Sequence, residues 1–260
     1  MDLYMKDFTM TYQQILAQIR KNESAFDLLF SDEYRFSTHL YKQKDDQLPD
    51  MYQHNAFITD GMPDEKELLA AENFQKENCA NFLLIKSNEK LPSSLIQHFH
   101  LEEDQTDTMF LKTESFRKWK RNPVVTIKNL KDIDIENDLL ETELNNYGAA
   151  YGEDFVKRKM HRYFEKSKKH NGFYYFGAYI GEMIAGACYV FFSDGCACID
   201  GLVVNEEYRK KHVATTLLSY IAEHFDGIIF LHADTNDTTK NMYERMGFET
   251  IEVVYEYLKI

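Results

Sequence analysis

One short stretch brings a carboxylate, a run of cations and two small side chains close together in the sequence. Asp200 lies in an apolar segment, three cations run from Arg209 to Lys211, and Ala214 and Thr215 precede residues with helical apolar spacing. The first turn of a helix has unpaired N–H groups and the positive end of the helix dipole. A phosphate group satisfies both, so this order predicts an anion site at a helix start.

The segments around this stretch switch between the periodicities of strands and helices. After Pro123 the pattern predicts strands at 124–127, 173–179, 183–192, 196–204, 228–233 and 252–259, and helices at 133–147, 153–168, 215–224 and 238–246. Antiparallel hairpins come first, and strand–helix–strand crossings follow. This order predicts an α/β fold of the α+β type, with a mixed sheet and helices on its faces.

Three motifs in this half resemble those of the GNAT superfamily of acetyl-CoA-dependent N-acetyltransferases. The first is Leu202-Val203-Val204, then Tyr208, then Arg209-Lys210-Lys211-His212-Val213-Ala214, against the family's Arg/Gln-x-x-Gly-x-Gly/Ala. The second is Asn236, seven residues before Tyr243, and the third is Tyr243-Glu244-Arg245-Met246-Gly247-Phe248, similar to Tyr-x-x-x-Gly-Phe. The resemblance covers about residues 124–260 and implies a GNAT-like acyl-CoA N-acyltransferase fold.

The resemblance implies that the pyrophosphate of coenzyme A binds the backbone amides of the cationic loop and the following helical turn. It implies an oxyanion donor at the backbone N–H of Val204 or its neighbour, and contact between Asn236 and the cofactor arm. An ordinary helix cap is the equal alternative for Asn236. The expected cofactor-binding residues are Leu202, Val203, Val204, Arg209, Lys210, Lys211, His212, Val213, Ala214, Thr215, Asn236 and Tyr243.

His212 departs from the family motif, which has a glycine there. A side chain narrows the room for phosphate, and a positive φ costs more than in glycine, although His tolerates it better than most residues. The imidazole could instead donate to a phosphate. We expect cofactor binding to be retained, and weakened affinity is the alternative.

Asp200 and Tyr243 are the expected catalytic residues. An attacking amine must lose a proton, because an ammonium with a pKa of about 10.4 is almost wholly protonated at neutral pH. Asp200 could accept that proton, position the substrate ammonium, or serve a structural role, and all three remain open. Tyr243 is the candidate general acid for the departing thiolate, and a core tyrosine is the alternative.

The first half, residues 1–122, is expected to be a separate α/β domain, followed by a GNAT domain over residues 123–260. Helices are predicted at 12–20, 64–77 and 92–100 and strands at 81–86 and 108–112, with a polar turn before the last strand. This half lacks the phosphate-loop motif, and it is either a degenerate second GNAT-like copy or a simple extension. Its aromatic segment around Tyr52, His54, Asn55 and Phe57 could wall an acceptor pocket or pack a core.

The amino-acid composition limits the classes of ligand and the cellular compartment that we expect for this protein. The net charge of −13 argues against nucleic acid. It would attract cationic small molecules, and a role in solubility alone is the alternative. No apolar run is long enough for a membrane span, and the N-terminus lacks a signal-peptide pattern, so a cytoplasmic protein is expected. Four cysteines without a framework fit a reducing compartment, and Cys196 and Cys198 are expected to be buried, with no metal site.

The sequence therefore predicts an N-acetyltransferase that uses acetyl-CoA as co-substrate. The acceptor is expected to be a small, possibly cationic amine that attacks the thioester directly in a ternary complex. Two other classes stay open. One is a non-catalytic acyl-CoA-binding or regulatory module, and the other is a longer-acyl or aminoacyl transferase on a tandem version of the fold. The acceptor's identity and the oligomeric state are not specified by the sequence.

Overall fold

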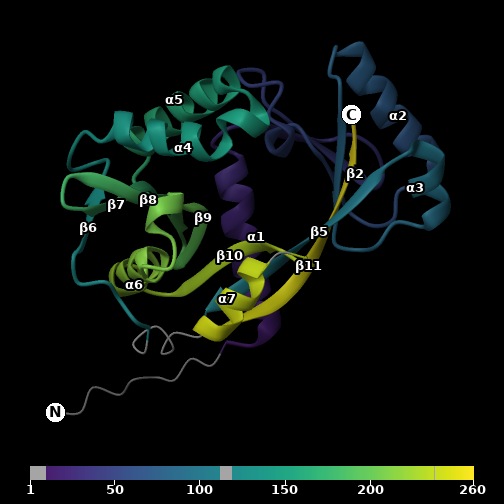
Figure 1. Cartoon of the computed structure of the whole chain (residues 1–260). Helices are drawn as coiled ribbons and strands as arrows, with labels where there is room; N and C mark the ends of the chain where they lie inside the picture. Colours follow the sequence, from purple (N-terminus) through teal and green to yellow (C-terminus); the bar gives the residue numbers. More distant parts are fainter. Residues whose placement is uncertain (1–9, 112–118, 237) are drawn as a thin grey trace.

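A single sheet runs through the molecule from one end to the other (Figure 1). The computed structural model describes residues 10–111, 119–236 and 238–260. Within them the sheet has eleven strands in the order β1-β2-β3-β4-β11-β5-β10-β9-β8-β7-β6. Two neighbouring pairs, β3 with β4 and β9 with β10, are parallel, and the others described are antiparallel. The predicted mixed sheet is thus confirmed.

The elements of the first half are α1 (Tyr12–Asp27), β1 (Asp32–Arg35), β2 (Leu40–Lys44), the short 3-10 helix η1 (Tyr52–His54), β3 (Phe57–Thr59), α2 (Glu65–Glu77), β4 (Leu83–Ser87), α3 (Ser93–Phe99) and β5 (Glu102–Leu111). Part of the first half, including α2, α3 and β2, lies at the right of Figure 1, whereas α1 and β5 lie among elements of the second half. The helix predicted over 64–77 is α2. Its cap residue Asp64 accepts from the Glu67 N–H at 2.9 Å, and the Glu67 carboxylate accepts from the Asp64 N–H at 3.0 Å.

The second half follows the predicted order of strands and helices. It contains β6 (Val125–Asn129), α4 (Glu136–Tyr151), α5 (Glu153–Lys169), β7 (Phe173–Ile180), β8 (Met183–Ser193), β9 (Cys196–Val204), η3 (Glu206–Tyr208), α6 (Val213–His224), β10 (Ile228–Asp234), α7 (Thr238–Met246) and β11 (Phe248–Lys259). The expected bounds of β9 and α7 are confirmed to the residue. Apolar residues and flanking turns define β9 in the sequence, whereas α7 is defined by the apolar spacing of Met242, Tyr243 and Met246 and by Gly247 after its end.

The prediction was wrong for the polar segment before residue 108. Glu102 to Asp107 form the first part of β5 instead of a turn, and they pair with β11 from Tyr257↔Glu103 to Val253↔Asp107. Glu102 to Gln105 alternate between exposed and half-buried, Thr106 is half-buried, and Asp107 is buried. A strand with one face exposed to solvent contains few apolar residues, so its sequence resembles that of a polar loop.

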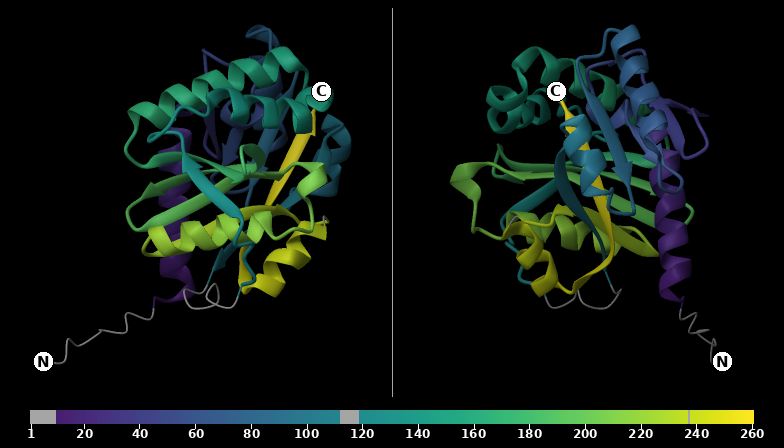
Figure 2. Two further views of the ribbon diagram at one scale, coloured as in Figure 1. Left: turned by 60° about the vertical axis from the view of Figure 1, so that its left-hand side comes forward. Right: turned by 90° about the vertical axis from the view of Figure 1, so that its right-hand side faces the viewer.

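Helices cover both faces of the sheet. Figure 2 shows α4 and α5 on one side of the second half and α6 and α7 on the other. Successive side chains of β9 point to opposite faces of the sheet. Cys198 belongs to the buried cluster that includes residues of α1, α4 and α5, whereas Ile199 belongs to the cluster that includes residues of α6 and α7. We call these the α5 face and the α6 face. Cys196 and Cys198 are buried on the α5 face, as expected.

The two halves share the centre of the sheet. β5 lies between β10 and β11, and β11 in turn pairs with β4. The first helix, α1, packs on the α5 face against the second half, with Ile19 buried there. No helix among the described residues has both the length and the apolar character needed to cross a membrane.

Candidate functional site

The parallel strands β9 and β10 separate before they end. Their pairing runs from Ile228↔Cys196 to Leu231↔Ile199 and stops there. β9 continues from Asp200 to Val204 along β8 alone, with Val203 opposite Ala187 and Val204 opposite Gly186. One edge of this end of β9 is therefore left without a strand partner among the described residues, and an extended ligand could pair with it.

A bulge begins this separation. The register of β8 and β9 shifts between Ala187 and Tyr189, and Gly201 sits in the bulge with φ of +58°. A Cβ on Gly201 would lie 2.7 Å from Cε1 of Tyr189. Glycine accommodates both the left-handed backbone and this close contact. The lack of a side chain at Gly201 therefore lets the ring of Tyr189 pack against the bulged backbone of β9.

The segment after β9 is anchored to neighbouring elements. The Asn205 N–H donates to the Ala185 carbonyl at 3.0 Å, and its amide group donates to the Ile184 carbonyl at 3.0 Å. Asn146 of α4 donates to Oδ1 of Asn205 at 3.1 Å. These bonds fix the direction in which the chain leaves β9 and enters the cationic loop.

His212 caps α6 in a left-handed conformation, with φ of +59° and ψ of 24°. Lys210, two residues earlier, also has a positive φ, 62°. The carbonyl of His212 accepts from the Thr216 N–H at 3.1 Å and from the Thr216 hydroxyl at 2.7 Å. The histidine thus adopts the conformation that the family's glycine favours, and the turn into the helix is formed.

The first turn of α6 presents backbone N–H groups that could bind a ligand. Among the described residues, none accepts a hydrogen bond from the N–H groups of Val213, Ala214 or Thr215. Val213 is buried, whereas Ala214 and Thr215 are half-buried. The hydroxyl of Thr215 is already used, since it donates to the carbonyls of Lys120 at 2.8 Å and His212 at 3.1 Å. An anion at this turn would therefore bind backbone amides.

The three cations of the loop are exposed around this turn. Arg209 donates from Nε to the Val204 carbonyl at 3.2 Å, which joins the loop to the separated end of β9. Lys211 lies over the Tyr208 ring, with Nζ 5.2 Å from the ring centroid, and its carbonyl accepts from Asn122 at 2.9 Å. Of the expected site residues on β9, Val203 is buried, and Leu202 and Val204 are half-buried.

Tyr243 belongs to the α6 face. It is 8% exposed and shares a buried cluster with Val213 of α6 and Ala233 of β10, with its ring 5.7 Å from that of Phe248. Asn236 is exposed in the turn after β10, and its N–H donates to Asp234 at 2.7 Å. The residue after it lies outside the described residues.

Asp200 lies on the opposite, α5 face, two residues after Cys198 in the alternation of β9. Its Oδ2 accepts from the Tyr189 hydroxyl at 2.6 Å, and its Oδ1 accepts from the Gly201 N–H at 2.6 Å. Asp200 and Tyr243 therefore approach the separated strands from different faces. Such an arrangement would suit a reaction in which two substrates meet through the gap.

Other titratable side chains surround Asp200 on this face. Burial and the negative charges of Glu143 and Asp200 raise the pKa of Tyr147 to about 12. Burial also raises the pKa of Glu143, which is 2% exposed and accepts from the Tyr175 hydroxyl at 3.2 Å. Both residues lie on α4, one helical turn apart.

His232 of β10 belongs to the same group of titratable side chains. Burial acts to lower its pKa, but the hydrogen bond and charge of Glu23, together with Asp200, raise the pKa above its ordinary value. Its Nε2 lies 3.2 Å from Glu23 of α1, and the two side chains are 30% and 29% exposed. These groups thus interact strongly and still keep surface that a ligand could reach.

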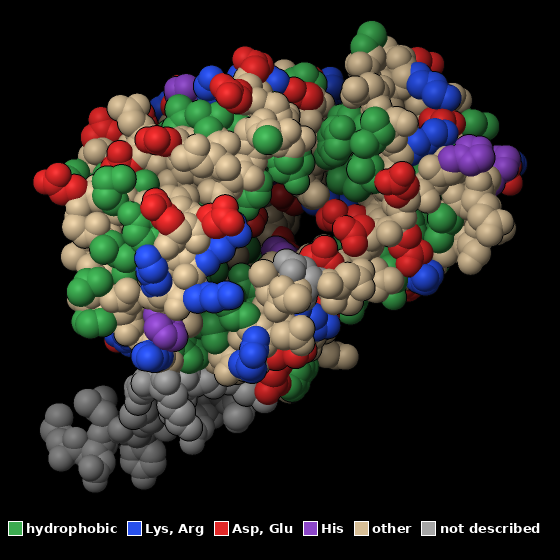
Figure 3. Space-filling model, viewed as in Figure 1, with side chains coloured by type: hydrophobic (Ala, Val, Ile, Leu, Met, Phe, Trp, Pro, Cys, Tyr) green, Lys and Arg blue, Asp and Glu red, His purple; other side chains and the backbone are tan. Residues whose placement is uncertain are grey.

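A hollow opens on the molecular face shown in Figure 3, between the two halves of the chain. Asp and Glu side chains gather around it, and Lys and Arg side chains lie between it and α6. Figure 3 has the same viewpoint as Figure 1, in which β9 and β10 run toward the region of the hollow. The surroundings of the hollow are therefore acidic on one side and cationic on the other.

Sequence reasoning missed the tyrosines and charges that face Asp200. Tyr189 and Tyr163 occur within regular apolar patterns of a strand and a helix, where an aromatic residue usually indicates core. Glu143 offered a weak signal, because it lies on the buried stripe of α4, where only a paired or functional carboxylate is expected.

Comparison with known proteins agrees with this architecture. Residues 137–248 match the model of the acetyltransferase (GNAT) family. This match lies within the second half of the chain and contains its three motifs, which confirms their resemblance to the GNAT family. No curated protein matches the chain in sequence.

Solved structures share the fold over most of the chain. A functionally unknown conserved protein from Staphylococcus epidermidis ATCC 12228 has a TM-score of 0.77 at 19% identity, covering 88% of this chain and 94% of that one. A GCN5-related N-acetyltransferase from Kribbella flavida has a TM-score of 0.67 at 12% identity, covering 94% and 95%. A tandem GNAT protein from the clavulanic acid biosynthesis pathway has a TM-score of 0.55 at 13% identity, covering 85% and 78%. The predicted GNAT-like fold with an additional N-terminal α/β part is confirmed.

Proposed function

We propose that the protein is an acetyl-CoA-dependent N-acetyltransferase that acts on a small cationic amine. The observation that carries the proposal is the open helical turn of α6 beside the separated ends of β9 and β10, within a GNAT-family domain. An anion site and an unpaired strand edge lie next to each other there. A ligand with a diphosphate at one end and an amide-rich arm at the other fits both.

In this proposal the pyrophosphate of coenzyme A binds the amides of Val213, Ala214 and Thr215. Arg209, Lys210 and Lys211 add positive charge around it, and the left-handed His212 leaves the turn in its binding conformation. The pantetheine arm follows Leu202, Val203 and Val204 into the gap, and Asn236 contacts it from the end of β10. The thioester carbonyl then lies near the backbone N–H of Val204, which stabilises the oxyanion.

The acceptor enters from the α5 face, where Asp200 and Glu23 provide carboxylates. A cationic amine is favoured by this local charge and by the net charge of −13. Asp200 accepts the ammonium proton, directly or through water, or holds the ammonium in place. The neutral amine attacks the thioester carbonyl, and Tyr243, reaching the gap from the α6 face, protonates the departing thiolate.

The direct test is the release of coenzyme A thiol from acetyl-CoA over a panel of diamines, polyamines, amino sugars and monoamines. We expect thiol release that depends on the amine and is fastest with a cationic acceptor. Thermal shifts with acetyl-CoA, free coenzyme A and longer acyl-CoAs should be run beside it. No stabilisation by any of them would contradict the proposal.

The same experiments separate the other classes. Stabilisation by acyl-CoA with no turnover on any amine would indicate a binding or regulatory module. Turnover with longer acyl-CoAs but not with acetyl-CoA would indicate a longer-acyl transferase.

A further inference from the structure

A buried carboxylate in the middle of the shared sheet has no part in the reaction as proposed so far. Asp107 of β5 is 1% exposed, and it lies opposite Ala233 of β10 and Val253 of β11. Its neighbours on the same face of β5, Met109 and Leu111, are apolar members of the α6-face cluster. Burying a carboxylate in such a row is costly unless it is paired and hydrogen-bonded, so Asp107 needs a reason beyond packing.

Asp107 lies at the level of the gap between the separated strands. The pairing of β9 with β10 stops at Leu231, and Asp107 is opposite the residue two positions further along β10. The alternation of β5 places Asp107 on the α6 face, which is also the face of Tyr243. The carboxylate is therefore one strand away from the gap, on the side from which the thiolate is proposed to leave.

Two side chains from different elements bind this carboxylate. Lys240 of α7 donates from Nζ to Oδ2 at 3.0 Å, and Thr250 of β11 donates from Oγ1 to Oδ1 at 3.0 Å. Burial acts to raise the pKa of Asp107, but hydrogen bonds that include these two, together with the charge of Lys240, bring the pKa below its ordinary value. Asp107 is therefore ionised at neutral pH, and the Lys240 side chain that pairs with it is only 23% exposed.

Strand β5 holds the chain on both sides of the turn that follows β10. Before the turn, the Thr235 N–H donates to the carbonyl of Gln105 at 3.0 Å. After it, Lys240 reaches Asp107. Asn236 lies between these two contacts. A strand of the first half thus fixes the segment that leads into α7, although this segment belongs to the second half.

Helix α7 depends on such contacts because it is short. It has 9 residues, fewer than a helix needs to be stable by itself in water. Its last residue, Met246, is held at the other end, where the carbonyl accepts from the Trp119 indole N–H at 2.7 Å. Lys240 and Tyr243 are three positions apart, so they are neighbours on one side of the helix. The ion pair with Asp107 thus fixes the turn of α7 that leads to Tyr243.

We propose that Asp107 is a positioning residue for Tyr243. Its ion pair with Lys240 sets the place of the first turn of α7, and with it the place at which the Tyr243 hydroxyl reaches the gap. The inference rests on the proposed N-acetyltransferase function and on the role of Tyr243 as the proton donor in it. A proton donor must lie within hydrogen-bond reach of its acceptor, and a displacement of about 1 Å can lower a rate by as much as about 10²-fold.

This role gives the first half of the chain a part in the transfer step. That half has no phosphate-loop motif, and it supplies none of the proposed cofactor-binding residues. Asp107 does not touch a substrate in this proposal. It acts only through Lys240 and the backbone of α7, so the effect of its substitution should appear in kcat and should depend on the presence of the Tyr243 hydroxyl.

The experiment measures kcat for the full-length protein and its variants, with acetyl-CoA and the best amine of the panel. Rates are expressed per acetyl-CoA binding site, counted by calorimetric titration, so unfolded protein does not affect kcat. Asp107→Asn keeps the shape of the side chain and removes its charge. We expect kcat to fall about tenfold, while the Kd for acetyl-CoA stays within about threefold.

The central readout is the coupling between Asp107 and Tyr243. If Asp107 acts by placing the Tyr243 hydroxyl, its substitution should matter little once that hydroxyl is gone. Asp107→Asn should therefore lower kcat by less than about twofold in the Tyr243→Phe background. A merely structural role would lower kcat by the same factor in both backgrounds.

Two variants of Lys240 test the link to α7. Lys240→Met should lower kcat as Asp107→Asn does, and the double variant should be within about twofold of either one, because both substitutions break the same ion pair. Lys240→Arg, which keeps the charge, should restore part of the difference. The double variant leaves no unpaired charge in the sheet, so it keeps the proposal testable if Lys240→Met fails to fold.

Glu72→Gln is the matched control. The Glu72 carboxylate of α2 also accepts from a lysine of another element, Lys259 of β11, at 2.6 Å. Lys259 lies at the end of β11 that pairs with β4, away from the gap. This variant should leave kcat unchanged, and a fall equal to that of Asp107→Asn would overturn the inference.

The outcomes separate this inference from the function on which it rests. Absence of turnover in the unmodified protein would overturn the proposed function and the inference with it. Turnover in the unmodified protein with the same relative loss for Asp107→Asn in both backgrounds, or with no loss in either, would overturn the inference alone.

Discussion

His212 shows how a departure from a family motif can preserve backbone geometry. It is a non-glycine residue with a φ of +59°, a conformation that histidine reaches more readily than β-branched residues. The carbonyl of His212 receives the capping bonds of α6, and the three amides that follow remain open. In the proposed function this turn binds phosphate through its backbone, so the conformation of residue 212 matters more than the identity of its side chain.

Tyr243 provides a prediction at the same scale. If its hydroxyl protonates the leaving thiolate, Tyr243→Phe should lower kcat by about 10²-fold or more, while the Kd for acetyl-CoA changes by less than about threefold. The loss of one oxygen preserves the packing against Phe248. Steady-state kinetics and calorimetry on the same preparation measure both quantities. Unchanged turnover would show that Tyr243 is only a core tyrosine.

His54 predicts a dependence of stability on pH. Its pKa is about 3 in the folded protein and about 6.5 when unfolded, so the unfolded chain binds the additional proton between these values. The stability is complete above about pH 6.5 and should fall by on the order of 3 to 5 kcal/mol as the pH drops toward 3. Asp27, with its raised pKa, acts in the opposite direction.

Denaturant unfolding of the protein and of His54→Gln, measured from pH 7 to pH 4, isolates this contribution. The variant should lose less stability over this range, because the glutamine does not titrate. Parallel curves for the two proteins would contradict the buried, neutral state of His54.

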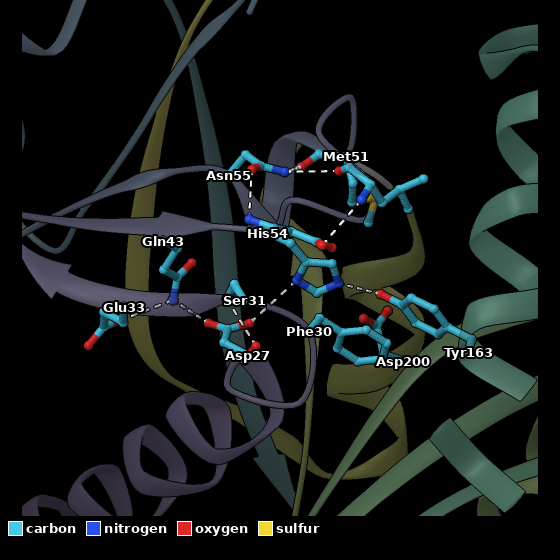
Figure 4. A network of polar contacts seen from close by, with 12 residues as sticks. Asp27, Phe30, Ser31, Glu33, Gln43, Met51, His54, Asn55, Tyr163 and Asp200 are labelled. Atoms are coloured by element: carbon cyan, nitrogen blue, oxygen red, sulfur yellow. Dashed lines mark hydrogen bonds and ion pairs between the residues drawn. The ribbon is translucent and has the colours of Figure 1, made fainter. Parts of the chain in front are cut away.

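At the scale of elements, α5 connects the two halves through a pair of arginines. Arg162 pairs with Asp45, which is 1% exposed, whereas Arg158 pairs with the more exposed Asp50. A buried carboxylate without its partner is costly, and an exposed one is not. The same helix carries Tyr163, whose hydroxyl lies 2.8 Å from Nε2 of His54 (Figure 4).

The two arginines give a matched pair of variants. Arg162→Met should destabilise the protein by about 3 to 5 kcal/mol, because it leaves Asp45 buried and unpaired. Arg158→Met should cost less than about 1 kcal/mol. Unfolding free energies from urea titrations measure both. Equal effects would mean that Asp45 reaches solvent when its partner is removed.

The elements also show what a sequence can and cannot predict. β9, α7 and the phosphate loop were predictable because local apolar spacing and motif residues define them. β1 and β2 were missed, since β1 is exposed at all four positions and β2 carries a buried lysine and glutamine. The position of His54 beside Tyr163 depends on chain segments more than 100 residues apart. No local pattern contains that information, although the aromatic segment around His54 was already a candidate wall for the acceptor pocket.

The whole molecule is organised around a sheet that both halves share. We propose that residues 1–122 and 123–260 are two lobes of one folding unit, and the idea that the first is a degenerate GNAT-like copy remains a prediction. β5, from the first lobe, separates β10 from β11 of the second. The GNAT-family domain therefore lacks a central strand without the preceding residues.

This arrangement predicts the behaviour of fragments. Residues 123–260 expressed alone should not form a cooperatively folded, CoA-binding protein, since β10 and β11 would expose unpaired edges. Co-expression with residues 1–122 should restore folding. Circular dichroism and thermal unfolding measure the outcome. A stable fragment that binds coenzyme A would contradict the shared folding unit.

The most direct test of the central claim is calorimetric titration of acetyl-CoA into the protein and into Ala214→Asp. A carboxylate in the first turn is compatible with the dipole of α6 but repels a diphosphate from the amides of Val213 to Thr215. Asn137→Asp, which adds the same charge to the first turn of α4, is the control. We predict one binding site per chain, an affinity at least about tenfold weaker in Ala214→Asp, and no change in Asn137→Asp. Equal affinity in all three proteins, or no binding to any of them, would contradict the account.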